Sequence, residues 1–447
     1  MPGRMPIIGR AIALAVLLAC APVVALAQSI IRDAEIERAL QELAAPVFRV
    51  AGLPQSTRVI IINDGSMNAF VADARHIFVH SGLLLRLDSP DQLQAVLAHE
   101  AAHIANGHLT ARPAAAASAQ TAARMGLLLA LAAGAASGEG GAAIGLAAGG
   151  MSSAQRSLMA HTRAEEASAD QSALRYMVSA GIDPEAMLEV LDLFRGQEAL
   201  SVGRQDPYVR SHPLTRDRYR TVQAFLATRG TDAEPSAASA YWYARLNAKL
   251  SAFLRNPSWT LRRVDRNDTG EIATLSRAIA HHRTPDADRA LAEVGRLLQM
   301  RPGDPFYQEL QGQILFESRR FDAAIAAYGR AVELAPREPL ILAGYGRALL
   351  APDSAASNAR ALDVLSRAQA RDPFDPRMLR DLALAHARAG QPGMAATVTA
   401  ERYAVLGRME DAAALANRAV GLLPQGSPGW IRAQDVLRVA EAAQRRR

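Results

Sequence analysis

Two histidines and a glutamate in the first half of the chain have the spacing of a catalytic metal site. His99, Glu100 and His103 form the pattern His-Glu-Ala-Ala-His. On a helix, residues four positions apart share a face, so both imidazoles can bind one metal ion. Neutral imidazole suits zinc, and the glutamate is placed to deprotonate a water molecule held there. The pattern predicts a zinc peptidase site, against the alternative of a helix with two surface histidines.

The residues before this pattern favour the helix that the site requires. Ser89 is a candidate N-cap, Pro90 suits the first helical position, and Gln92 completes a capping box. Further upstream, β-branched and apolar runs predict strands over 58–62, 68–71 and 76–80. His76 and His80 lie on the last of these strands and are expected to be ordinary strand residues.

A catalytic zinc site also needs a third protein ligand. Glu166 and its neighbour Glu165 are the candidates, and only one can face the metal because adjacent helical residues point about 100° apart. Spacing alone leaves that choice open. Asp170 lies one turn after Glu166, where it would accept a hydrogen bond from the second nitrogen of a ligand histidine. His108 is expected to have a structural or outer-shell role.

The N-terminus has the pattern of a secretory signal. Arg4 and Arg10 precede an apolar run, and Ala25-Leu26-Ala27 supplies a small-x-small cleavage site. Removal of residues 1–27 takes away two arginines and no acid, which lowers the net charge from +6 to +4. A lipid anchor at Cys20, the single cysteine, is the alternative. After ordinary cleavage the chain has no disulfide and no thiolate ligand.

Composition narrows the remaining functions. The chain has 447 residues, of which 50% are hydrophobic and 21% charged, enough for two or three globular domains. Its positive charge is almost entirely arginine, with Lys249 the single lysine, and no basic stripe alternates with aromatic residues. We therefore expect no nucleic-acid binding. The fold class predicted is α+β and mainly helical.

Three regions follow the signal. We expect a zinc metallopeptidase domain with a small sheet over 28–228, a helical linker over 229–285, and tetratricopeptide-type helical repeats over 286–447. Within the first region, the segment 112–151 is rich in Ala and Gly, and its apolar run, Met125 to Ala136, is too short to span a bilayer. It is a packed hairpin, a lid over the site, or a peripheral membrane contact.

Small and aromatic residues recur in the last region at the spacing of paired helices. Gly312 and Gly346 are 34 residues apart, and small residues allow paired helices to approach closely. Such repeats offer a concave surface for protein partners. The positions that define the successive units are Gly312, Ala324, Tyr328, Ala331 and Pro336; Gly346, Ala361, Leu365, Ala368 and Pro373; Ala383 and Ala395; and Gly407, Ala412, Ala416, Ala419 and Pro424.

The motif blocks together resemble the family of HtpX- and CAAX-prenyl-protease-like gluzincin peptidases, over roughly residues 30–225. The matching blocks are Asn68–Phe70, His80–Leu84, His99–His103, Glu166–Asp170, and His212-Pro213 with Arg218. The resemblance implies one zinc ion per chain, bound by His99, His103 and Glu166, with Glu100 as the catalytic base. Many members carry transmembrane helices between the two ligand segments, and this chain has only the short segment 112–151 there.

The resemblance also implies where the enzyme acts and how its activity is regulated. Periplasmic members act on misassembled outer-membrane proteins and contact the outer-membrane assembly machinery. Their histidine at the position of His212 can take the fourth zinc position and hold the enzyme latent; the alternative is that His212 only packs beside Pro213. We expect substrate strands to pair with the sheet edge near residues 69–80. The rival function is a non-proteolytic chaperone or scaffold that acts through the repeats.

Overall fold

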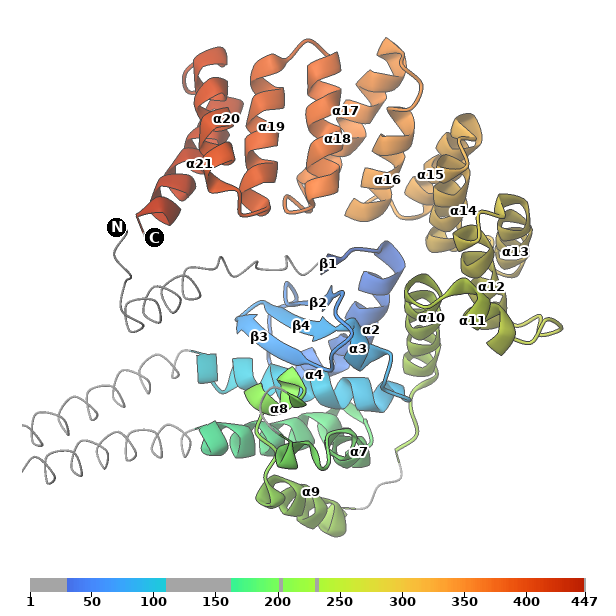
Figure 1. The fold of residues 1–447 in the computed structure, drawn as a ribbon, viewed down its shortest axis with the longest axis vertical. Helices are drawn as coiled ribbons and strands as arrows, with labels where there is room; N and C mark the ends of the chain where they lie inside the picture. The colour runs from blue at the N-terminus through green and yellow to red at the C-terminus, as the bar shows by residue number, and fades with distance from the viewer. Residues whose placement is uncertain (1–29, 110–161, 201–203, 230–232, 446–447) are drawn as a thin grey trace, which may run out of the picture.

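The computed structural model describes residues 30–109, 162–200, 204–229 and 233–445. The expected signal segment 1–27, Cys20 and the segment 112–151 lie outside these residues. Figure 1 shows a layered lower part, in which a sheet lies above several helices, and a curved row of helices that arches over the sheet. The α+β, mainly helical fold class is confirmed.

A four-stranded sheet forms the upper layer of the lower part. Its order is β1-β2-β4-β3, with β2 and β4 parallel and the other neighbours antiparallel. The expected substrate edge over 69–80 is therefore too long: β4 is paired on both sides, and β3 alone forms that edge. The strands are β1 (Ile30–Ile31), β2 (Arg58–Ile62), β3 (Ala69–Asp73) and β4 (His76–His80).

Helix α4 (Pro90–Ala105) packs against β3, β4 and the long helix α2 (Ala34–Val50). Its predicted start is confirmed, because the Ser89 hydroxyl accepts a hydrogen bond from the Gln92 N–H at 3.2 Å and Pro90 occupies the first turn. All residues from Pro90 to His103 are buried. The helix that carries the His-Glu-Ala-Ala-His pattern therefore runs through the core rather than over the surface.

Further helices complete the lower part, and among them α7 and α9 lie beneath α4 (Figure 1). Residues 162–180 are helical and lead into α7, which packs on α4 and α9. Apolar side chains from the sheet, α2, α4, α7 and residues 162–180 share one hydrophobic cluster. These helices are α3 (Ser81–Leu84), α7 (Glu185–Leu193), α8 (Pro207–Ser211) and α9 (Arg216–Arg229).

Helix α10 (Ala237–Leu254) joins the two parts of the molecule. It packs on α2 and on α12 (Glu271–Arg283), and its Leu246 and Leu250 belong to the same hydrophobic cluster as α2 and α4. The short α11 (Pro257–Arg263) follows, and α12, inside the expected linker, packs along α13 (Ala287–Met300).

Two buried cations on α10 hold this junction together. The Lys249 ammonium lies 2.9 Å from Asp33 Oδ2 and 3.1 Å from Glu35 Oε2, at the start of α2. The Arg245 guanidinium contacts Glu35 as well and reaches Asp304, which caps α14. The start of the first helix and the start of the repeats are thus tied to the same two side chains.

The curved row consists of helix pairs, each packed on the next. Tyr328 lies between Gly312 and Gly344, where a Cβ atom would come within 2.6 and 2.5 Å of its ring. Glycine at these positions allows three neighbouring helices to close on one tyrosine. The helices are α14 (Pro305–Glu317), α15 (Phe321–Leu334), α16 (Pro339–Leu349), α17 (Ala355–Gln369), α18 (Pro376–Arg388), α19 (Pro392–Val405), α20 (Met409–Leu422) and α21 (Pro428–Gln444).

Among the described residues, no helix is both long and apolar enough to cross a bilayer.

Candidate metal centre

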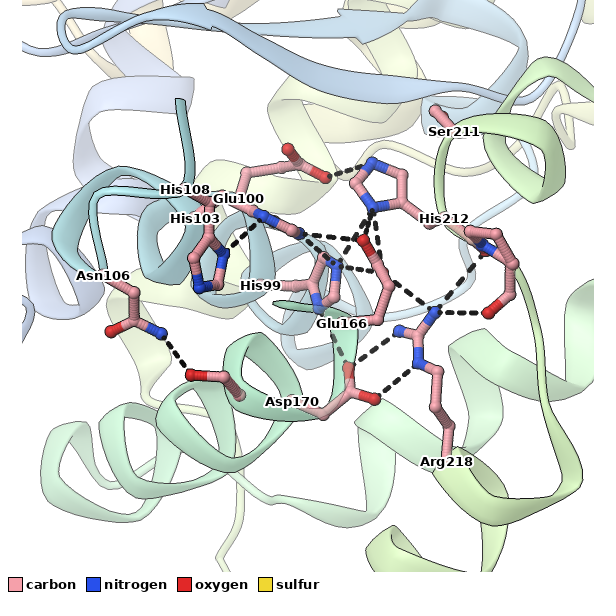
Figure 2. A network of polar contacts seen from close by, with 12 residues as sticks. His99, Glu100, His103, Asn106, His108, Glu166, Asp170, Ser211, His212 and Arg218 are labelled. Carbon is pink, nitrogen blue, oxygen red and sulfur yellow. Dashed lines mark hydrogen bonds and ion pairs between the residues drawn. The ribbon is translucent and has the colours of Figure 1, made fainter. Parts of the chain in front are cut away.

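The two histidines of the motif point to the same place from one face of α4. Their Nε2 atoms lie 3.1 Å apart, and both side chains are buried. Glu100, between them in sequence, is fully buried as well, and neither carboxylate oxygen has a hydrogen-bond partner. Figure 2 shows these residues with their neighbours from three other segments.

Glu166, from the helical residues 162–180, supplies a carboxylate to the same place. Its Oε2 lies 3.3 Å from His99 Nε2, and its Oε1 lies 3.4 Å from His103 Nε2. The side chains that could share one ion, among the described residues, are His99, His103, Glu166 and His212. Glu165, the rival that spacing left open, is not one of them.

His212, directly after α8, completes the group. Its Nδ1 lies 3.1 Å from Glu166 Oε2 and 3.3 Å from His99 Nε2, while its Nε2 lies 3.4 Å from Glu100 Oε1. The ring packs against Tyr208, with centroids 4.7 Å apart. The Tyr208 N–H in turn donates to the Met67 carbonyl just before β3, at 3.3 Å. His212 therefore faces both the ligand cluster and Glu100.

Asp170 and Arg218 lie behind this cluster. Asp170 Oδ1 is 2.9 Å from His99 Nδ1, and the carboxylate receives two hydrogen bonds from Arg218 at 2.6 and 2.8 Å. Arg218 Nη1 also lies 3.0 Å from Glu166 Oε2. Arg218 stood in the family pattern without a role, and no spacing in the sequence indicates that one buried guanidinium would contact both carboxylates.

The charges in this site keep its carboxylates ionised. Burial by itself would raise the pKa of Glu166, but His212 and His99 hold that pKa well below its ordinary value. Arg218 and His99 likewise outweigh burial and lower the pKa of Asp170. For His99, burial opposes the charged ring, yet hydrogen bonding to Asp170 and Glu166 raises its pKa to about 9. The site thus favours positive charge at its centre.

The geometry of the four donors fits a zinc ion. Donors about 2.0–2.1 Å from a tetrahedral zinc lie about 3.3 Å from one another. Five of the pairs formed by these four side chains have donor atoms 3.1, 3.3, 3.3, 3.4 and 3.1 Å apart, where Glu166 Oε2 faces His99 and His212 and Glu166 Oε1 faces His103. All four side chains are buried, and imidazole nitrogens with a carboxylate oxygen are donors that zinc accepts. The residues present are therefore suited to hold zinc.

Part of the chain matches a known class of enzyme. Residues 31–225 match Peptidase family M48, so this part of the chain is similar to the peptidase domain of that family. Over 375 residues the chain is 24% identical to the beta-barrel assembly-enhancing protease of Yersinia pestis, covering 82% of this chain and 75% of that protein. It is also 40% identical to protease HtpX of Salmonella newport (strain SL254) over 79 residues, 17% of this chain and 26% of that one. The resemblance drawn from the motif blocks is confirmed.

One solved structure is similar to part of the chain. The structure of a thermophilic TPR protein in Thermus thermophilus matches 38% of this chain and 99% of that one, at 19% identity and a TM-score of 0.26.

Proposed function

We propose that this protein is a zinc-dependent endopeptidase of the gluzincin type, with one zinc held by His99, His103 and Glu166. The observation that carries the proposal is the convergence of buried nitrogen and oxygen donors at tetrahedral spacing. Bound zinc would polarise the scissile carbonyl and lower the pKa of the attacking water. Side chains of the protein transfer the proton, orient the ligands and bind the substrate.

Glu100 is the general base in this proposal. Its carboxylate is buried and accepts no hydrogen bond, with His212 Nε2 3.4 Å from Oε1, so it can take a proton from water once His212 has moved. After attack on the peptide carbonyl, Glu100 passes that proton to the leaving amine. Asp170, held by Arg218, faces His99 Nδ1 and keeps the Nε2 lone pair of His99 directed at the ligand cluster.

The substrate is held in an extended conformation along β3. This strand is at the edge of the sheet, and α4 packs against it, so a peptide added there lies close to the catalytic residues. Main-chain pairing supplies affinity without a strict side-chain preference, which suits unfolded or misassembled proteins as substrates.

His212 makes the described state latent. Its Nδ1 stands among the zinc donors and its Nε2 faces Glu100, so it occupies the region where water and the scissile carbonyl must meet. A substrate can react only after His212 has moved. The Tyr208 and Met67 contacts fix this arrangement beside β3, the same edge that the substrate uses.

The proposed setting is the periplasm, in quality control of misassembled outer-membrane proteins and in contact with the outer-membrane assembly machinery through the helical repeats. The name of the Yersinia pestis relative and its match over most of both chains support this setting. The proposed regions are a peptidase domain over 28–228, a helical linker over 229–285 and helical repeats over 286–447.

Cleavage of an unfolded protein such as casein tests the peptidase. We expect Glu100→Gln to lose about 10²–10⁴-fold in turnover, since that is what a general base contributes, while zinc binding persists. His212→Ala should cleave faster than wild type if His212 maintains latency. A folded Glu100→Gln variant with full activity contradicts the base assignment. If none of the three proteins cleaves, the repeats carry the function as a scaffold.

A further inference from the structure

The two histidines of α4 are supported from behind by different groups. His99 Nδ1 faces the carboxylate of Asp170 at 2.9 Å, whereas His103 Nδ1 faces another imidazole, His108 Nδ1, also at 2.9 Å. The rings of His103 and His108 have centroids 4.9 Å apart and planes inclined by 72°. His103 is fully buried, and His108 is 8% exposed.

The end of α4 places His108 in this position. Asn106 is the C-cap, and Gly107 follows with a φ of +71°, a left-handed conformation that glycine adopts without strain. The Gly107 N–H bonds back to the Ile104 carbonyl at 3.1 Å. The chain therefore reverses directly after the helix, and the next side chain lies against the last helical turn. Figure 2 shows His108 on the opposite side of His103 from Glu166.

Two facing Nδ1 atoms at this distance require one proton between them. His103 Nε2 is directed at Glu166 Oε1 and His99 Nε2, so a zinc ligand at this position must keep its lone pair on Nε2. Its proton is then on Nδ1, and His108 must accept it with an unprotonated Nδ1. We infer that His108 is a positioning residue, whose Nδ1 accepts a hydrogen bond from His103 Nδ1–H and so fixes the tautomer and ring orientation of His103. The inference rests on the proposed zinc site.

Loss of this acceptor should weaken zinc binding. Without His108, the buried Nδ1–H of His103 loses the acceptor that it faces, and the His103 ring is no longer held in one orientation. Partners of this kind typically contribute 10–100-fold in metal affinity.

Two variants of similar shape distinguish the loss of the hydrogen-bond acceptor at His108 from the loss of its packing. In His108→Asn the amide oxygen takes the place of the Nδ1 atom, whereas His108→Leu has the same shape without an acceptor. We expect the leucine variant of the full chain to bind zinc about 10–100-fold more weakly in competition with a chromophoric chelator, and the asparagine variant to stay within a few-fold of wild type. His386→Leu, which removes a buried histidine bonded to Gln391 in the repeats, is the control and should leave zinc affinity unchanged.

The outcomes distinguish this inference from the proposed function. Wild type that binds no zinc would overturn the metal centre and this inference together. Wild type that binds zinc no more tightly than His108→Leu would overturn this inference alone, as would an asparagine variant as weak as the leucine one. Nitrogen NMR of zinc-loaded wild type with labelled histidine gives a check that needs no stable variant. A protonated Nδ1 on His103 and an unprotonated Nδ1 on His108 support the inference, and the reverse tautomer overturns it.

Discussion

Two clusters of buried charge, one at the metal centre and one at the α10 junction, surround buried carboxylates with different partners. Each encloses fully buried carboxylates, Glu166 and Asp170 in one and Glu35 in the other. At the junction, Lys249 and Arg245 lie directly against the acid. At the metal centre, one guanidinium serves both carboxylates, and three imidazoles converge on the same point.

The difference separates a structural charge cluster from a ligand site. A buried carboxylate must be paired or hydrogen-bonded, and the junction meets this need with cations from the chain itself. The metal centre instead collects more lone pairs than its own cation can satisfy, and neither Glu100 oxygen accepts a hydrogen bond, although Oε1 lies 3.4 Å from His212 Nε2. A surplus of directed donors indicates a site built for a cation from outside.

The largest effect is expected when the junction loses its own cation. Lys249→Met leaves Glu35 and Asp33 without the ammonium that lies about 3 Å from both, and removal of one partner from a buried pair costs about 3–5 kcal/mol. Urea unfolding of the full chain measures this loss. Arg330→Met, which removes a surface pair with Glu333, is the control and should cost at most about 1 kcal/mol. Equal effects of the two variants would show that the junction is not a stabilising cluster.

A smaller effect is expected when the metal centre loses its cation. Zinc at about 100 times its Kd stabilises a folded protein by about 2.7 kcal/mol, so chelation should lower the melting temperature correspondingly. Because the two clusters share no residue, the losses from chelation and from Lys249→Met should add to within about 0.5 kcal/mol. A melting temperature that does not respond to chelator would remove the contrast between the clusters.

The smallest effect concerns the surplus acid at the junction. Burial raises the pKa of Glu309 to about 7. Attraction by the Lys249 ammonium opposes this rise, and repulsion from Asp33 and Glu35 adds to it. The folded state therefore holds this proton more tightly than the unfolded state, and the resulting stability is present at acidic pH and lost as pH rises through about 7. Between pH 5 and pH 8 wild type should therefore lose more stability than Glu309→Gln, in which this group cannot titrate. Parallel pH profiles would exclude this titration.

Local chemistry makes one part of the molecule predictable from sequence. The capped start of α4 follows from Ser89 and Pro90, and the close helix packing around Tyr328 follows from Gly312. These features depend on neighbours within a turn or within one repeat.

Features that depend on distant pairing are not predictable in this way. An edge over 69–80 includes β4, and excluding that strand requires knowing that β2 pairs with it. The choice between Glu165 and Glu166 needs the rotation of their helix relative to α4. Nothing in the sequence indicates that Lys249 meets Asp33 and Glu35, more than two hundred residues away.

Helix α10 has a consequence for anyone who divides or recombines this gene. A fragment that stops at residue 228 would lack Leu246 and Leu250, which complete the hydrophobic cluster of the peptidase half, and would strand Glu35 without either cation. Such a truncation should aggregate rather than yield an isolated enzyme. A chimera that borrows repeats from a relative must keep α10 with the peptidase half and supply an acid at the place of Asp304 to meet Arg245.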